Sequence, residues 1–128
     1  MVYHVLNRAN ARVQIFDNDE DYRLFEEILE EAVEKFDMRL PAYCLMPNHI
    51  HLLIQPASGS TISRIMHCLN TQYVKYFNAR HQRVGHLFQG PFRTRLVEDE
   101  NYLLIASRYI HRNPVKAGLC DSPKAFPW

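Results

Sequence analysis

The sequence predicts an α+β fold: a ferredoxin-like, split βαβ arrangement with a four-stranded antiparallel sheet, plus an additional C-terminal helix. The first observation behind this prediction is the order of the segments, β-α-β-β-α-β-α, whose first six elements are those of the split βαβ unit. The second is size. A chain of 128 residues with 47% hydrophobic content is enough for one core, so we expect residues 1–128 to form a single domain.

The N-terminal part predicts a strand and a helix. Residues 3–7 alternate between apolar and polar side chains like a short strand, and the polar residues 8–18 indicate a loop. Asp19 or Asp21 can cap a helix that extends to about Phe36, because apolar side chains recur there at helical spacing. The face expected to be buried consists of Tyr22, Phe25, Ile28, Leu29, Ala32, Val33 and Phe36.

The middle of the chain predicts two strands and a second helix. Residues 38–46 and 49–55 are rich in strand formers, and Pro47-Asn48 between them is typical of a tight turn. The helix is expected at residues 62–80, after a cap at Ser60 or Thr61. Its expected buried side chains are Ile62, Ile65, Met66, Leu69, Tyr73 and Phe77.

The C-terminal part predicts a fourth strand and the additional helix. Residues 92–97 (FRTRLV) have strand character. The helix is expected to begin near Glu98 or Asp99 and to end at about His111, because Pro114 cannot continue it. The sequence thus places a helix beyond the split βαβ unit, where it is free to cover the sheet's second face.

Charge is segregated along the chain, although the net charge is only +1. Residues 17–37 hold ten of the fourteen acidic residues, whereas residues 38–97 contain no Asp or Glu. The second segment carries seven Lys and Arg residues and five of the seven histidines. Such a positive field attracts a polyanion such as nucleic acid. The alternative is that the acidic helix only balances the basic segment across the fold.

Composition argues against membrane and secreted classes. No apolar run approaches the roughly 20 residues needed to cross a bilayer, and the N-terminal residues show no signal sequence. Three widely spaced cysteines give neither a zinc pattern nor a disulfide framework. We therefore expect a cytoplasmic protein without a membrane partner.

The most informative motif is His49-Ile50-His51 in the third predicted strand. Side chains alternate between the two faces of a strand, so His49 and His51 share one face and Ile50 lies on the other. Two adjacent imidazoles provide half of a metal site. A bare His-x-His also occurs by chance on structural surfaces, so the rest of the site must come from elsewhere in the chain.

The additional helix offers the missing groups. Tyr109 and Asn113 are four residues apart, so they lie on one helical face. Asn113 has an amide oxygen that could be a third metal ligand. Tyr109 has a phenol, which becomes a more accessible nucleophile near a divalent cation and several arginines. Taken alone, a tyrosine at this position is more often an aromatic residue of the core.

These motifs resemble those of the single-tyrosine transposases of the HUH (His-hydrophobic-His) endonuclease class, most of all the REP-associated branch. The resemblance rests on MPNHIHLL at 46–53 and YIHRNPVKAGL at 109–119. It extends to YHVLNRANARVQIF at 3–16 and GHLFQGPFRTRLV at 85–97, and so covers almost the whole chain. It implies that residues 1–128 form one HUH endonuclease and transposase domain, in a nucleoid-associated protein of prokaryotic type.

The resemblance also implies a mechanism. Enzymes of this class bind single-stranded DNA with hairpins, and a tyrosine attacks a phosphodiester to form a 5′-phosphotyrosine and free a 3′-OH; a second transfer rejoins the strands. His49 and His51 match the metal-binding pair, Tyr109 the nucleophile and Asn113 the third ligand, so the last helix would be catalytic. Insertion-sequence relatives have Gln where Asn113 stands. The implied cofactor is Mg²⁺ or Mn²⁺, of which Mn²⁺ suits two imidazoles better.

Several cationic or imidazole side chains are expected to contact the DNA. Asn7 is a weaker candidate for the same role, and His111 could instead face solvent or cap the helix. The expected DNA contacts are Arg8, Arg12, Arg80, Arg83, Arg93, Arg95, His111, Arg112 and Lys116.

Two rival functions and one question of assembly remain open at the level of sequence. The first rival function is a catalytically idle nucleic-acid-binding regulator on the same scaffold. The second is a metal-dependent hydrolase that uses water, which would need a carboxylate near the metal; the acid-free segment 38–97 disfavours it. A homodimer is also possible, because insertion-sequence relatives share active sites between subunits.

Overall fold

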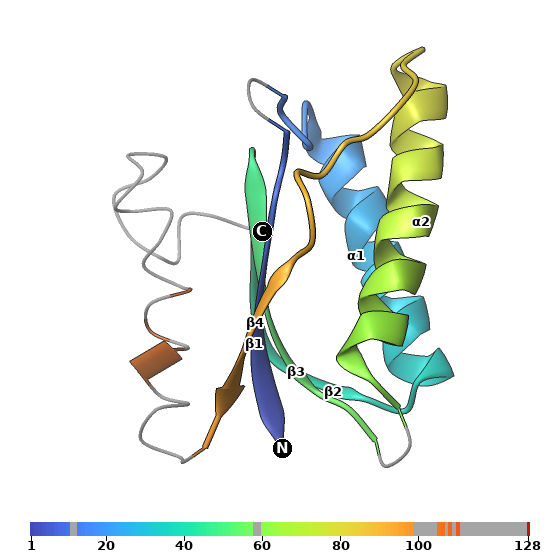
Figure 1. Cartoon of the computed structure of the whole chain (residues 1–128). Coiled ribbons are helices and arrows are strands. Elements are labelled where there is room, and N and C mark those ends of the chain that lie inside the picture. The colour runs from blue at the N-terminus through green and yellow to red at the C-terminus, as the bar shows by residue number, and fades with distance from the viewer. Residues whose placement is uncertain (11–12, 58–59, 99–104, 107, 109, 111–127) are drawn as a thin grey trace.

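The computed structural model describes residues 1–10, 13–57, 60–98, 105, 106, 108, 110 and 128. It confirms the predicted α+β architecture, and Figure 1 shows α1 and α2 together on one side of the sheet. The four strands are antiparallel and lie in the order β2-β3-β1-β4. The elements are β1 (Val2–Arg8), α1 (Asp19–Lys35), β2 (Arg39–Met46), β3 (His49–Gln55), α2 (Ile62–Arg80) and β4 (Arg93–Val97).

Strand β3, which carries the paired histidines, is central as predicted, between β2 and β1. Its alternate residues Ile50, Leu52 and Ile54 are fully buried in the main core beneath the helices. His49 and His51 consequently lie on the opposite face, which we call the open face because neither α1 nor α2 covers it.

Both helices bury the faces that the spacing predicts. On α1, Tyr22, Phe25, Ile28, Leu29 and Ala32 are buried, while Val33 and Phe36 are partly buried against the same core. On α2, the buried set is Ile62, Ile65, Met66, Leu69, Tyr73 and Phe77. Thr61 caps α2, because its side-chain oxygen accepts a hydrogen bond from Arg64 N at 3.2 Å.

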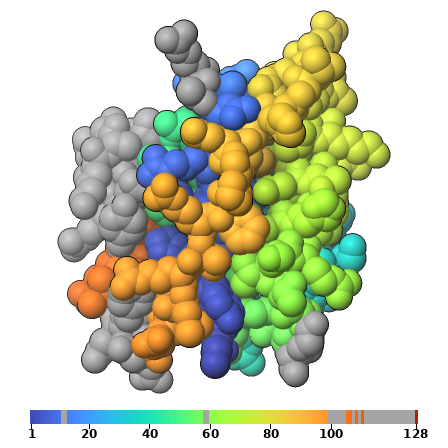
Figure 2. Space-filling view, viewed as in Figure 1, coloured from blue at the N-terminus to red at the C-terminus, as the bar shows by residue number. Residues whose placement is uncertain are grey.

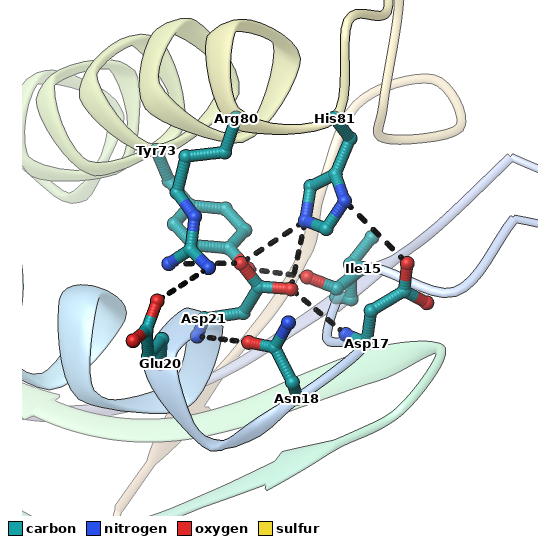
Figure 3. A network of polar contacts seen from close by, with 8 residues as sticks. All are labelled: Ile15, Asp17, Asn18, Glu20, Asp21, Tyr73, Arg80 and His81. Atoms are coloured by element: carbon teal, nitrogen blue, oxygen red, sulfur yellow. Dashed lines mark hydrogen bonds and ion pairs between the residues drawn. The ribbon is translucent and has the colours of Figure 1, made fainter.

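The N-cap of α1 is Asn18, so the prediction of Asp19 or Asp21 was wrong. Asn18 Oδ1 accepts from Asp21 N at 3.1 Å, which satisfies one of the unpaired amides of the first turn. Asp21 is instead fully buried and accepts from Asp17 N at 2.9 Å, while its carboxylate meets His81 at the C-terminal end of α2 (Figure 3). The carboxylate therefore ties the two helices together.

A second, smaller apolar cluster lies on the open face. Residues 105, 106, 108 and 110 are helical, and Figure 1 shows the segment at residue 105 across the sheet from α1 and α2. Ala106 and Ile110 are buried there with Val97 and Leu53. The first and last turns of the expected last helix lie outside the described residues. Within the described part of the chain, no helix is both long and apolar enough to cross a membrane.

Candidate active site on the open face of the sheet

The paired histidines sit side by side at the end of β3 that leads out of the hairpin turn. Their ring centroids are 5.0 Å apart and the rings are nearly perpendicular, at 83°. The turn before them is fixed by the chain that follows β1, because Ala9 N donates to Asn48 O at 2.9 Å and Ile15 N donates to Pro47 O at 2.7 Å. The two imidazoles therefore project from a rigid hairpin.

Each histidine has a neighbour on its Nδ1 atom. His49 Nδ1 lies 2.7 Å from Asn48 Oδ1, and since that oxygen only accepts, Nδ1 carries the proton. His51 Nδ1 lies 3.1 Å from His4 Nε2. With the Nδ1 atom of His49 protonated, its Nε2 atom keeps the lone pair that a metal requires.

The imidazoles are held in the neutral form that binds metals. Burial is the largest cause that lowers the pKa of His51 from 6.5 to about 3, and His49, His4 and Arg8 add to it by charge. Burial followed by the charge of Arg8 lowers the pKa of His49. Burial followed by the charge of Arg95 lowers the pKa of His4. Protons therefore do not compete with a cation at these nitrogens near neutral pH.

Three of the predicted DNA contacts share this face. In the antiparallel register Arg8 pairs with His49, and Arg93 and Arg95 of β4 pair with Leu6 and His4 on β1. Side chains at paired positions lie on the same face of a sheet, so the three exposed guanidinium groups flank the histidines. The open face thus combines imidazoles with fixed positive charge.

A pocket of about 370 Å³ opens beside the arginines, and its walls come from β1, the start of β4 and the segment between α2 and β4. That segment is pinned to β1, because Gln89 N donates to Arg8 O at 2.8 Å and Asn10 N donates to Leu87 O at 2.9 Å. Figure 2 shows the segment and β4, in orange, as a continuous band down this side of the molecule. The lining residues are Leu6, Arg8, Gln89, Gly90, Pro91, Phe92 and Arg93.

Two other predicted DNA contacts lie at the C-terminal end of α2 and just after it. Arg80 forms ion pairs with Glu20 at 2.8 Å and Asp21 at 3.5 Å, so its charge is balanced by α1 (Figure 3). Arg83 donates to Asn78 Oδ1 and to His86 O in the segment after α2. Arg80 is therefore less available to bind phosphate than Arg83, whose two acceptors are uncharged.

Asn7 is not a DNA contact on the open face, which corrects that expectation. It lies on the helix-facing side of β1, is 1% exposed, and donates from Nδ2 to Asn70 Oδ1 at 2.9 Å. Alternation along the strand explains the difference, because Leu6 and Arg8 on either side of it face the other way.

The remaining predicted site residues cannot be placed. Among the described residues, no group of three or more His, Cys, Asp or Glu side chains is arranged to hold a metal ion. The expected site needs the amide of Asn113 as third ligand, and its role stays a prediction. The expected residues outside the described part of the chain are Tyr109, Asn113, Arg12, His111, Arg112 and Lys116.

Sequence reasoning missed three contributors to this site. His4 forms a hydrogen bond with His51, and Asn48 forms one with His49. Phe92 lines the adjacent pocket. Asn48 adjoins His49 in the sequence, so a side-chain hydrogen bond between neighbours was a detectable signal. His4 is 47 residues from His51, and only the pairing of β1 with β3 brings them together.

Comparison with known proteins identifies the family and agrees with the fold. Residues 1–113 match the family described as "Transposase IS200 like", so the chain belongs to the IS200-like transposase family. A Haemophilus influenzae protein named as a REP-associated tyrosine transposase is 29% identical over 114 residues, 81% of this chain. The match spans only 65% of the length of that relative.

Two solved structures share the fold. A REP-associated tyrosine transposase bound to a REP hairpin has a TM-score of 0.83, with 17% identity over 99% of this chain and 74% of the other. A Deinococcus radiodurans protein described as a transposase has a TM-score of 0.63, with 19% identity over 88% of this chain and 89% of the other. At these identities the likeness establishes the architecture.

Proposed function

We propose that this chain is a metal-assisted tyrosine transposase that cuts and transfers single-stranded DNA carrying hairpins. Tyr109 would attack a phosphodiester through its phenol oxygen and form a 5′-phosphotyrosine, which frees a 3′-OH on the other fragment. A DNA 3′-OH would then attack the phosphotyrosine and release Tyr109. The observation that carries the proposal is the pair His49 and His51, held neutral and anchored on a sheet face lined with arginines.

The donor set fits a divalent cation. The lone pair of His49 lies on Nε2, because Nδ1 carries the proton that is donated to Asn48 Oδ1. Two imidazoles with the amide oxygen of Asn113 leave room for water and phosphate oxygens, as Mn²⁺ or Mg²⁺ requires. When bound, the cation would polarise the phosphate under attack and offset the charge that develops on it.

Described helical residues close to Tyr109 in the sequence pack against the sheet, which supports Tyr109 as the nucleophile. Ala106 and Ile110 belong to the same buried cluster as Cys44 and Met46. Those two residues of β2 pair with His51 and His49, so described helical residues pack beside the histidines' strand partners. Tyr109 directly precedes Ile110 in the sequence.

The arginines and the adjacent pocket support a nucleic-acid substrate. Arg8, Arg93 and Arg95 share the open face with the histidines and can bind phosphate oxygens along one strand. Phe92 and Gln89 in the pocket offer an aromatic surface and an amide for an unpaired base. The related transposase of known structure is bound to a REP hairpin, and we infer a hairpin-bearing substrate here.

The observations leave two rivals to be tested. A catalytically idle regulator would use the same arginines and bind DNA without cutting it. A hydrolase that uses water would need a carboxylate beside the metal, yet β3 and its neighbours β1 and β2 carry no Asp or Glu. A homodimer that shares active sites remains a further possibility for the assembly.

One experiment separates these functions. The protein is incubated with 3′-end-labelled hairpin single-stranded DNA and Mn²⁺ or Mg²⁺, and the products are run on a denaturing gel. We expect a denaturation-resistant protein–DNA adduct with the natural chain and none with Tyr109→Phe, because the phenylalanine ring has no oxygen. Tyr76→Phe is the matched control, since Tyr76 is an exposed tyrosine on α2.

The alternatives give different products. DNA binding without adduct would contradict the proposal and support the idle regulator. Cleavage that survives Tyr109→Phe would contradict it in favour of the hydrolase. Loss of the adduct on removal of the metal with a chelator, and its return with Mn²⁺, would support metal assistance.

A further inference from the structure

We infer that His4 is a positioning residue: it accepts a hydrogen bond from His51 Nδ1–H, so that the lone pair of His51 lies on Nε2, the nitrogen that would bind the metal. The inference rests on the proposed metal role of His51. It adds a third histidine to the site, one that belongs to β1 and was not among the residues expected from the motifs.

The contact is specific to the sheet register. His4 pairs with Leu53 of β3, so His4 and His51 are diagonal neighbours on the open face. Their rings lie 5.3 Å apart, and His4 Nε2 approaches His51 Nδ1 to 3.1 Å. His51 is only 3% exposed, so this contact lies away from bulk water. The two nitrogens therefore share one proton.

The position of that proton decides what His51 can do. If His4 Nε2 donated it, His51 would carry its own proton on Nε2, and that nitrogen could not bind a cation. If His51 Nδ1 donates it, His51 Nε2 keeps a lone pair and the proton of His4 lies on its own Nδ1. Only the second arrangement makes His51 a ligand through Nε2.

The neighbouring histidine shows the same arrangement. His49 Nδ1 donates to Asn48 Oδ1 at 2.7 Å, an acceptor that fixes the proton on Nδ1. With His4 as acceptor, His49 and His51 both have a protonated Nδ1 and an Nε2 lone pair. Metal-binding histidines in general donate their second ring nitrogen to such a partner, which fixes tautomer and orientation.

His4 acts through His51 and is not itself a ligand in this arrangement. The described His, Cys, Asp and Glu side chains form no group of three that could hold a metal ion, although His4, His49 and His51 are all described. The Nε2 atom of His4, which faces the pair, is occupied by its contact with His51. Its contribution is therefore the orientation and tautomer of the ring next to it.

The variants His4→Gln and His4→Leu test this role. The amide oxygen of Gln can reach about as far as the imidazole Nε2 atom and accept the same hydrogen bond, whereas Leu cannot accept one. The first measurement is the tautomer of His51 in the metal-free protein at neutral pH, read from long-range ¹H–¹⁵N spectra assigned with His51→Gln. We expect Nδ1–H in the natural chain and in His4→Gln, and a shift toward Nε2–H in His4→Leu.

The second measurement is the dissociation constant for Mn²⁺ alone, by electron paramagnetic resonance. We expect His4→Leu to weaken Mn²⁺ binding by roughly 10- to 100-fold, the usual loss when such a partner is removed, and His4→Gln to restore most of it. Thermal unfolding of each variant verifies that the sheet is intact.

The outcomes separate this inference from the proposed function. Nε2–H in the natural chain, Nδ1–H that persists in His4→Leu, or equal Mn²⁺ affinity of His4→Leu and the natural chain would overturn the role of His4. A natural chain that shows Nδ1–H on His51 but binds no Mn²⁺ would contradict the proposed metal site, while the hydrogen bond from His51 to His4 would stand.

Discussion

The two faces of β3 carry different kinds of side chain only one residue apart. Ile50 and Leu52 point toward α1 and α2, where they are fully buried in the main core. His49 and His51 point the other way, among arginines and beside a much smaller apolar cluster. The strand therefore anchors the site through one face and presents it on the other. Substitutions on one face should therefore change stability, and substitutions on the other should change chemistry.

The largest expected effect comes from the helix-facing side. We expect Leu52→Ala to lower the free energy of unfolding by about 3–5 kcal/mol, because it removes a fully buried side chain and leaves a cavity under the helices. Urea denaturation measures the loss. Val84→Ala is the control, since Val84 is 90% exposed and its change should stay within about 0.5 kcal/mol. A loss as small for Leu52→Ala would contradict the division between the faces.

The next effect concerns the open face. We expect Arg93→Ala to weaken binding of single-stranded DNA by about 1.5 kcal/mol, roughly tenfold, and to reduce the dependence of log Kd on log salt by about one phosphate contact. Fluorescence anisotropy over a salt series measures both. Arg23→Ala removes the same charge from the exposed, acidic surface of α1 and should change neither. Equal effects of the two variants would show that only net charge matters.

The smallest effect is a pH dependence on the helix-facing side. Tyr43 donates to Glu26 Oε2 at 2.6 Å, and burial, followed by that hydrogen bond, raises the pKa of Tyr43 to about 12. The unfolded chain loses this proton near pH 10, so the contribution of the folded hydroxyl is complete below pH 10 and is lost as pH rises to 12.

For the natural chain we therefore expect the free energy of unfolding to fall more steeply between pH 10 and 12 than for Tyr43→Phe. The difference should be about 1 kcal/mol, measured by urea denaturation across the range. Parallel curves would mean that the hydroxyl of Tyr43 does not retain its proton in the folded state. DNA binding at neutral pH should not change, since Tyr43 lies away from the open face.

Local spacing in the sequence was enough to predict much of the fold. Alternation in β3 separated His51 from Leu52, and helical spacing identified the buried faces of α1 and α2, because both periods are geometric properties of the backbone. Long-range contacts were not predictable in this way. The hydrogen bond between His4 and His51 depends on the register of β1 against β3, which no local pattern encodes.

The ends of the helices show the same limit. Asn18, Asp19 and Asp21 are all good capping residues, and the choice among them was settled by tertiary contacts. The Asp21 carboxylate instead forms a hydrogen bond with His81 and an ion pair with Arg80 at the end of α2. The sequence likewise predicted that Arg80 binds DNA, because its ion pair with Glu20 of α1 is a long-range contact that no local pattern indicates.

The central claim is that chemistry occurs on the open face through Tyr109. The most direct test is to form the adduct with hairpin single-stranded DNA and Mn²⁺, digest the protein with trypsin, and locate the nucleotide by mass spectrometry. We predict one modified peptide, with the 5′-phosphate of the DNA on Tyr109. A nucleotide on another of the seven tyrosines, or cleaved DNA with no modified peptide, would contradict the account.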